Sequence, residues 1–204
     1  IEELCPQAAT IGELWPAVPV DVFKAPVYVG DIFSSMLLGG LVHTSTVLLR
    51  RERLRLVGGF DTSFKSGEDY EFHLHTSFHG PVALLDAPSI QYRIGAVDQL
   101  TEPKWQVEIA RNNLVIFNRW LEKGNDRHKL SITQIRDHIA GAYAWLGNAE
   151  LDAEQQWNAI KHLYMSLRLK PDIGVARRFG LSLLPAPILC AARTVRNRLR
   201  HRLA

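Results

Sequence analysis

Apolar residues recur at helical spacing throughout the second half of the chain. One stripe comprises Trp105, Ile109, Ile116 and Trp120. Ser131 and Gln134 then match a capping box, in which the hydroxyl and the amide satisfy each other's backbone donors, and Gly147 is the predicted end of the helix that they open. Asp152 and Gln155 resemble a second such start. The second half of the chain is therefore predicted to be all-helical.

The first hundred residues combine short apolar runs with one helical stripe. Residues 41–49 predict a buried strand that ends at the charged run 50–53. Residues 82–85 and 90–92 predict two further short strands, because a turn composition separates them. Within residues 70–79, apolar side chains recur at every fourth position, which predicts a helix. This part is expected to be α/β.

Composition is typical of a globular protein, with 47% hydrophobic and 22% charged residues among 204. The net charge of +3 comes from the end of the chain, since residues 193–204 hold five arginines and no acid. A basic tail of this kind meets phosphates or anionic lipid. With no zinc-finger spacing and no aromatic-basic platform, nothing else in the sequence indicates a nucleic-acid partner.

The sequence also bears on compartment and membrane. Cys5 and Cys190 lie far apart with no C-x-x-C, so neither a disulfide framework nor a zinc site is indicated and a cytoplasmic location is the simpler expectation. The chain begins with Ile1 and shows no signal peptide, which suggests a cut through a longer protein. Residues 173–204 join an apolar run to an arginine-rich one. They either lie on an anionic membrane surface, on the inner face of the cell membrane, or pack on the protein body.

Glu68 and Asp69 are the main candidates for chemistry. Adjacent carboxylates at the start of a helix can act as a general base, accept hydrogen bonds from a polar ligand, or cap the helix. Taken alone, the pair is more typical of a cap, because acidic residues are favourable near the positive end of the helix dipole.

The blocks around this pair resemble the acceptor half of family 2 glycosyltransferases of the GT-A type. The matching blocks are Arg50-Arg51-Glu52, Val57-Gly58-Gly59-Phe60-Asp61, Gly67-Glu68-Asp69-Tyr70, Leu85-Asp86 and Tyr92-Arg93. The resemblance implies an α/β fold, the C-terminal part of a GT-A domain followed by an all-helical region. It also implies inverting transfer of a sugar from a nucleotide-diphosphate donor to a glycan or lipid-linked acceptor, as in the synthesis of cell-surface polysaccharides.

The same resemblance assigns roles to individual residues. Asp69 would be the catalytic base, taking the proton of the acceptor hydroxyl, and Glu68 its neighbour that orients the acceptor. Gly58 and Gly59 would let the backbone approach the sugars closely. Phe60 would either offer an apolar face to a sugar ring or belong to the core. Arg93 completes the acceptor-binding set, where it could pair with either carboxylate or with a phosphate.

The donor side of such an enzyme is not recognisable in this sequence. The family holds Mg²⁺ or Mn²⁺ with an Asp-x-Asp motif in its N-terminal half, and no such motif occurs here. His73, His75 and His79 lack the carboxylate partner of a metal signature, so no metal ligand is assigned within the chain. The isolated chain is expected to be inactive. The expected organisation is a truncated glycosyltransferase part over 1–100, a helical region over 101–172 and a basic amphipathic tail over 173–204.

A helical interaction module is the alternative function. Residues 143–172 resemble one tetratricopeptide-like helical hairpin, a class whose repeats bind peptides. No period near 34 residues recurs, and one repeat buries little by itself, so the glycosyltransferase hypothesis ranks first.

Overall fold

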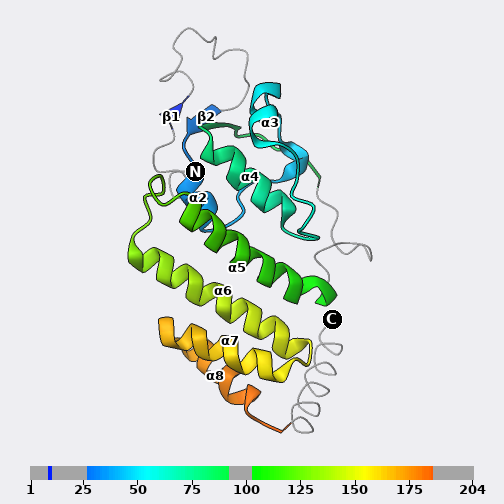
Figure 1. The fold of residues 1–204 in the computed structure, drawn as a ribbon, viewed down its shortest axis with the longest axis vertical. Coiled ribbons are helices and arrows are strands. Elements are labelled where there is room, and N and C mark those ends of the chain that lie inside the picture. The colour runs from blue at the N-terminus through cyan, green and yellow to red at the C-terminus, as the bar shows by residue number, and fades with distance from the viewer. Residues whose placement is uncertain (1–8, 11–26, 92–102, 186–204) are drawn as a thin grey trace. The chain divides into compact units, whose positions relative to one another are not determined.

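The computed structural model describes residues 9–10, 27–91 and 103–185, and within them the chain is mostly helical (Figure 1). The chain divides into two compact units. The first unit comprises Ile1–Glu102 and Val115–Leu130, and the second comprises Pro103–Leu114 and Ser131–Ala204. The long helix α5, Gln106–Lys123, supplies residues to both units.

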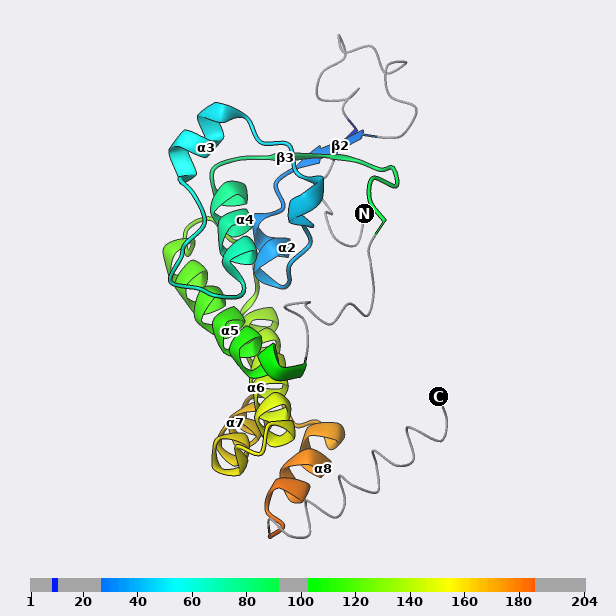
Figure 2. The same ribbon diagram turned by 90° about the vertical axis from the view of Figure 1, so that its right-hand side faces the viewer.

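The first unit contains a small antiparallel sheet in the order β1-β2-β3 (Figure 2). Its strands are β1, Ala9–Thr10; β2, Val27–Gly30; and β3, Val82–Leu85. Val27 pairs with Leu85 and Gly30 with Val82. The valines of β2 are buried in alternation with half-buried neighbours, the period of two that a strand imposes. On β3, by contrast, three of four residues are exposed, and among the described residues this strand is an edge of the sheet.

This architecture corrects the predicted fold class. An α/β fold of the GT-A type was expected, but the described residues are mostly helical, and their strands are two, four and four residues long. The strand at 82–85 is confirmed as β3. The one expected at 41–49 is wrong: this stretch contains a short 3-10 helix, Thr44–Thr46, and no strand. Ile90 and Gln91 are not in a strand, and Tyr92 lies outside the described residues.

The charged run at 50–53 opens a helix instead of ending a strand. Helix α3 spans Arg51–Val57 and follows the extended residue Arg50. Arginine and leucine have higher helix propensities than the β-branched residues that favour strands, which accounts for the outcome. The other helices of the first unit are α2, Phe33–Leu37, and α4, Glu68–Phe78. Helix α4 confirms the helix predicted from the stripe in residues 70–79.

The core of the first unit is a cluster of aromatic rings around Trp120. Trp120 is fully buried, and its ring contacts those of Phe33, His75 and Phe78 with centroids 6.2, 5.1 and 5.5 Å away. Its indole Nε1 donates a hydrogen bond to the buried carboxylate of Glu71, 3.2 Å away. The Trp120 side chain therefore packs α2, α4 and the last turns of α5 together.

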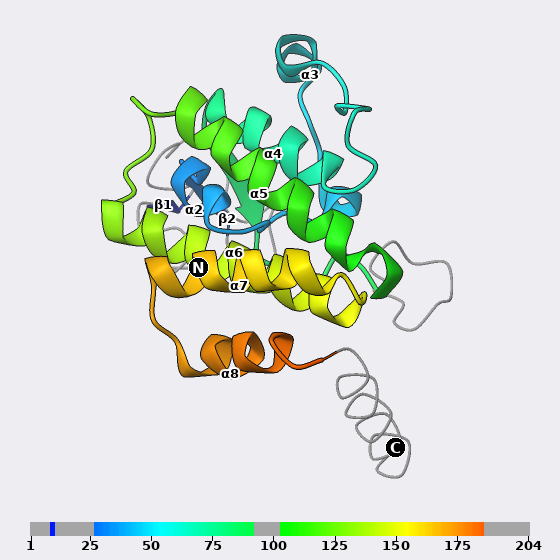
Figure 3. The same cartoon turned by 60° about the horizontal axis from the view of Figure 1, so that its bottom comes forward.

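Besides the first turns of α5, the described part of the second unit contains the helices α6, α7 and α8 (Figure 3). They span Ile132–Asp152, Gln156–Leu169 and Ile173–Ser182. Contacts between α6 and α7 run in opposite order along the two helices, so they are antiparallel: Glu150 pairs with His162, Ser166 bonds to the carbonyl of Ala140, and Lys170 pairs with Asp137. Gly147 allows the close approach, because a Cβ there would lie 2.8 Å from Cγ of Leu163.

The predicted helix starts in the second unit are half right. The capping box is confirmed: the Ser131 hydroxyl accepts from the backbone of Gln134, whose side chain accepts from the backbone of Ser131. Asp152 is not the N-cap residue of the next helix: it is the last residue of α6 and pairs with Arg178 at 2.9 Å, and α7 begins at Gln156 after Gln155. Helix α6 passes through Gly147, because the packing against α7 favours continuation over a stop there. Over the parts of the chain that the structure describes, no helix combines the length and apolar character needed to cross a membrane.

Candidate functional site

The candidate site lies at the first turn of α4, where the two predicted carboxylates sit. Gly67 occupies the N-cap position with φ 83°, a left-handed conformation that glycine adopts without strain. No side chain caps this helix end. Glu68 and Asp69 follow as its first two residues, so neither is the N-cap residue, but both lie in the first turn, where the helix dipole favours acidic side chains as expected.

The two carboxylates have different surroundings. Asp69 is exposed, and its Oδ1 accepts a hydrogen bond of 2.7 Å from the backbone N–H of Tyr70. Glu68 is half-buried; its Oε2 is shielded from solvent and has no hydrogen-bond partner among the described residues. A carboxylate oxygen that is shielded from water and accepts no hydrogen bond has an unfavourable free energy. Glu68 would therefore be stabilised by a ligand that donates a hydrogen bond to it. An accessible base therefore lies beside an under-satisfied acceptor.

The two glycines before the site leave open space around the backbone. Gly58 ends α3 with φ 78°, and its N–H bonds to the carbonyl of Leu54. A Cβ built on Gly58 or Gly59 would meet no atom within 4 Å. Phe60 is 47% exposed, and its ring lies 4.7 Å from that of Phe72 on α4. Phe60 is thus placed against the flank of α4 with about half of its surface available.

Asp61, which belongs to the same block, holds the loop in place. Its Oδ1 accepts from the backbone and hydroxyl of Ser63, and its Oδ2 pairs with Arg119 at 2.9 Å. The hydrogen bond from the Ser63 hydroxyl, followed by that from Arg119, lowers the pKa of Asp61 to about 2. The acid fixes the connection between Phe60 and α5 and is ionised at neutral pH.

One predicted site residue cannot be placed. Arg93, with Tyr92 beside it, lies outside the described residues. The arginine-rich end of the tail, residues 186–204, lies outside them as well. The grouping that the structure does provide is therefore Glu68 and Asp69 at the start of α4, with Phe60 on its flank.

His73, which the sequence argument considered only as a metal ligand, is a neighbour of the site. It stands one helical turn after Asp69 and is buried, with its Nε2 3.1 Å from the hydroxyl of Thr44. Burial lowers its pKa, and the charge of Asp69 opposes that shift. The available signal was the i, i+4 spacing from Asp69, which places both side chains on one face of a helix.

Acid is expected to destabilise the first unit through this helix. Burial lowers the pKa values of His73, His75 and His79, and the cations near His79 add to its shift. A histidine whose pKa is depressed on folding binds its proton more readily in the unfolded chain. Stability is therefore lost as pH falls below the ordinary histidine value of about 6.5. Urea midpoints should be lower at about pH 5.5 than at about pH 7.5.

A variant with glutamine at these three positions is the control for that experiment. It should show a smaller difference in urea midpoint between the two pH values than the unaltered chain. An unchanged difference would contradict the assignment of the acid sensitivity to α4.

The metal expected for the whole enzyme has no complete site in the described residues. No three of their histidine, cysteine, aspartate and glutamate side chains are grouped so as to hold a metal ion. Glu68 and Asp69 supply two carboxylates at most, so the residues present do not fit a metal centre by themselves.

Comparison with known proteins adds no relative. No protein-family model matches the chain, and neither curated proteins nor solved structures give a significant match.

Proposed function

We propose that the chain is the acceptor-side part of an inverting glycosyltransferase that uses a nucleotide-diphosphate sugar. Asp69 is the base: it takes the proton of an acceptor hydroxyl while that oxygen attacks the anomeric carbon and the nucleotide diphosphate departs from the opposite side. The donor pocket and the ligands for Mg²⁺ or Mn²⁺ belong to a longer protein. The proposal no longer rests on the GT-A fold class, which the helical structure overturns.

The observation that carries the proposal is the difference between the two carboxylates. Asp69 is open to solvent, as a base must be to reach an incoming hydroxyl, and Glu68 beside it has a shielded oxygen without a donor. A sugar hydroxyl is a donor of the right kind, so binding an acceptor would satisfy Glu68 and bring a second hydroxyl to Asp69. Phe60 adds an apolar ring face, on which a sugar ring can stack.

Exposed apolar side chains of the first unit support its being part of a larger protein. They include Leu48, Leu54, Leu56, Leu84 and Leu85, and Leu48 is fully exposed. Strand β3, which carries the last two, is also an edge of the sheet within the described part of the chain. Apolar surface beside an unpaired strand edge is typical of a face that another segment covers.

The test is a transfer assay on a longer protein that contains this sequence. Nucleotide diphosphate release would be measured with a panel of nucleotide sugars, with and without glycan acceptors. Proton NMR of the product would then give the configuration of the new bond. Acceptor-dependent release with inversion is expected. Release that is independent of acceptor, or a product with retained configuration, would contradict the proposal.

Membrane association through residues 173–204 is the second part of the proposal. Helix α8 carries no acidic residue, and Ile173, Arg177 and Leu181 are exposed at every fourth position of it. A stripe of apolar and basic side chains is suited to the boundary between anionic headgroups and acyl chains. The location that follows is peripheral, on the inner face of the cell membrane, where a lipid-linked acceptor would be presented.

A peptide-binding helical module remains the alternative function. The antiparallel pair α6–α7, closely packed through Gly147 and Leu163, is the observation that favours it. This function predicts that peptides bind the chain and that no sugar transfer occurs. The same transfer assay therefore separates the two functions.

A further inference from the structure

Four exposed side chains form a single line along α7, hereafter the α7 stripe. They are Trp157, Lys161, Tyr164 and Arg168. At 100° per residue, their directions fall within an arc of about 60° on the helix. The buried residues Ala159, Leu163 and Ser166 occupy the opposite side, against α6. The stripe is thus the outer face of the helix and runs for about 16 Å, at 1.5 Å per residue.

The aromatic members of the α7 stripe are unusually open. Trp157 is 84% exposed and Tyr164 is 51% exposed. Large aromatic side chains contribute much to interface energy, because each can bury 150–250 Å² with few rotatable bonds (~2 χ angles). An open tryptophan on a rigid, well-packed helix gains nothing from the fold around it. Together with Tyr164 on the same face, it offers aromatic surface that a binding partner could bury.

Positive charge accompanies these rings, and negative charge is nearly absent. Helices α7 and α8 together contain no aspartate or glutamate. Lys161 lies in no ion pair among the described residues, and the guanidinium of Arg168 lies 6.0 Å from the centre of the Tyr164 ring. Between them stands only Asp172, whose carboxylate caps α8 by accepting from Val175. The face is therefore complementary to an anionic surface.

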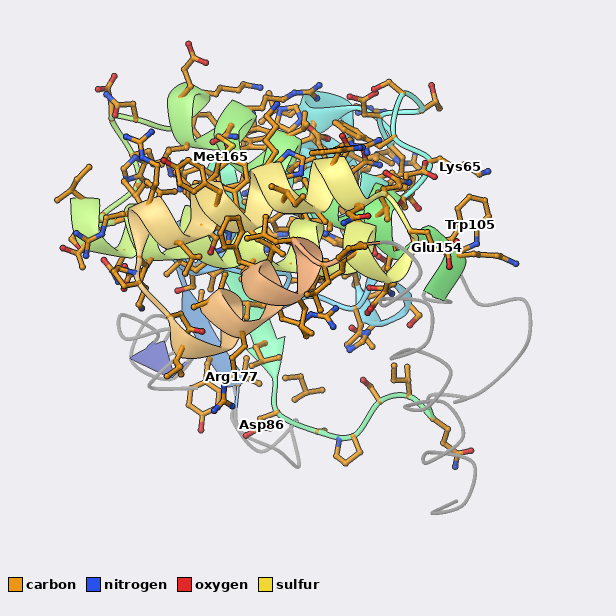
Figure 4. The ribbon with its side chains drawn as sticks, turned by 90° about the horizontal axis from the view of Figure 1, so that it is seen from below. Lys65, Asp86, Trp105, Glu154, Met165 and Arg177 are labelled. Atoms are coloured by element: carbon orange, nitrogen blue, oxygen red, sulfur yellow. The ribbon has the colours of Figure 1, made fainter. Side chains whose placement is uncertain are left out.

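The α7 stripe adjoins α8. The Tyr164 ring lies 6.2 Å from the ring of Phe179, so the aromatic line reaches the helix on which the membrane proposal rests. Figures 3 and 4 show the two helices side by side, with Arg177 on α8 extending away from α7. Exposed Ile173 continues the apolar character at the start of α8.

We propose that the α7 stripe is a docking surface for an anionic lipid bilayer, with Trp157 and Tyr164 inserted at the headgroup level and Lys161 and Arg168 paired with lipid phosphates. Tryptophan and tyrosine favour this depth because each joins an apolar body to a polar tip. Lysine and arginine lay their aliphatic stems along the apolar layer and keep their charges among the headgroups. The phosphates of an anionic headgroup layer can pair with the two cations, while the adjoining apolar layer accepts the two rings.

This inference rests on the proposed membrane association and assigns part of the membrane contact to the rigid helix α7 in addition to the tail. The experiment uses the full chain of 204 residues with vesicles of phosphatidylcholine containing about one third phosphatidylglycerol, at low salt. Binding is measured by co-sedimentation. Insertion is measured by quenching of tryptophan fluorescence with brominated phosphatidylcholine, and the Trp157→Phe variant identifies the contribution of that ring.

Two stripe variants should bind more weakly. Lys161→Gln with Arg168→Gln should reduce affinity roughly 30-fold, from about fivefold for each charge at an anionic surface. Trp157→Ala should reduce it roughly tenfold and Trp157→Phe should remove most of the quenching. Matched controls are Arg51→Gln with Arg55→Gln on α3, which removes the same charge, and Trp145→Ala on α6. Both should bind nearly as the unaltered chain does.

The outcomes separate the two membrane proposals. A variant with glutamine at all five tail arginines should lose affinity and still show quenching of Trp157. If that variant alone loses binding and the stripe variants bind normally, the stripe is rejected and the tail proposal stands. If the controls lose as much as the stripe variants, binding is unspecific and the stripe is rejected. If the unaltered chain does not bind anionic vesicles, both membrane proposals fail; binding to acidic peptides without binding to these vesicles would likewise overturn them.

Discussion

Replacing Asp69 with asparagine is expected to lower the turnover of sugar transfer by about 10² to 10⁴, the usual contribution of a positioned base. Asparagine keeps the size of aspartate but cannot take a proton at neutral pH. Because the side chain is exposed and accepts one backbone hydrogen bond, an amide oxygen can keep that contact. The substitution should therefore lower turnover without destabilising the fold. It would be measured as kcat and KM in the longer protein, with nucleotide diphosphate release as the signal.

Two further variants sharpen that result. Asp126→Asn makes the same substitution at an exposed position after α5 and should leave turnover unchanged. Glu68→Gln should raise KM for the acceptor more than it lowers kcat, since Glu68 is proposed to hold the acceptor and not to accept its proton. The free energy of unfolding, measured with urea, should be lower in Asp69→Asn by at most about 1 kcal/mol, the contribution of one charge near a helix start. Full turnover by Asp69→Asn would remove Asp69 from the mechanism.

The local elements could be predicted where a single pattern decided them. The stripe in residues 70–79 lies on α4 because side chains four apart fall on one helix face. The Ser131 and Gln134 side chains could be placed because both ends of a capping box lie within one turn. Strand β3 was also correctly placed. In each case the deciding interactions are local in sequence.

The failures come from positions that long-range packing decides. Gly147 stops a helix in isolation, but here it is the point at which α6 and Leu163 of α7 approach most closely. The α/β fold class was inferred from short apolar runs and from a resemblance over about 50 residues, and the mostly helical structure contradicts it. The i, i+4 spacing places His73 near Asp69, but its hydrogen bond to Thr44, 29 positions away, is not encoded by any local pattern.

Trp120→Ala is expected to lower the free energy of unfolding of the first unit by about 3 to 5 kcal/mol, the usual cost of emptying a buried aromatic site. The residue is fully buried, and three aromatic side chains, Phe33, His75 and Phe78, would lose their common contact. Its removal also takes the indole donor from Glu71, a buried carboxylate. Because domains are stable by only about 5 to 15 kcal/mol, this one change should bring the unit close to unfolding.

Trp157→Ala is the matched control, since the same substitution is made at a side chain that is 84% exposed on α7. In that variant the free energy of unfolding should change by no more than about 0.5 kcal/mol, measured by urea unfolding with far-ultraviolet circular dichroism as the signal. Far-ultraviolet circular dichroism is the suitable signal, because each substitution removes a tryptophan and so changes the fluorescence directly. Equal midpoints for the two variants would contradict the aromatic cluster as the core of the first unit. Stability retained by Trp157→Ala would at the same time show that its loss of vesicle binding reflects the α7 stripe and not unfolding.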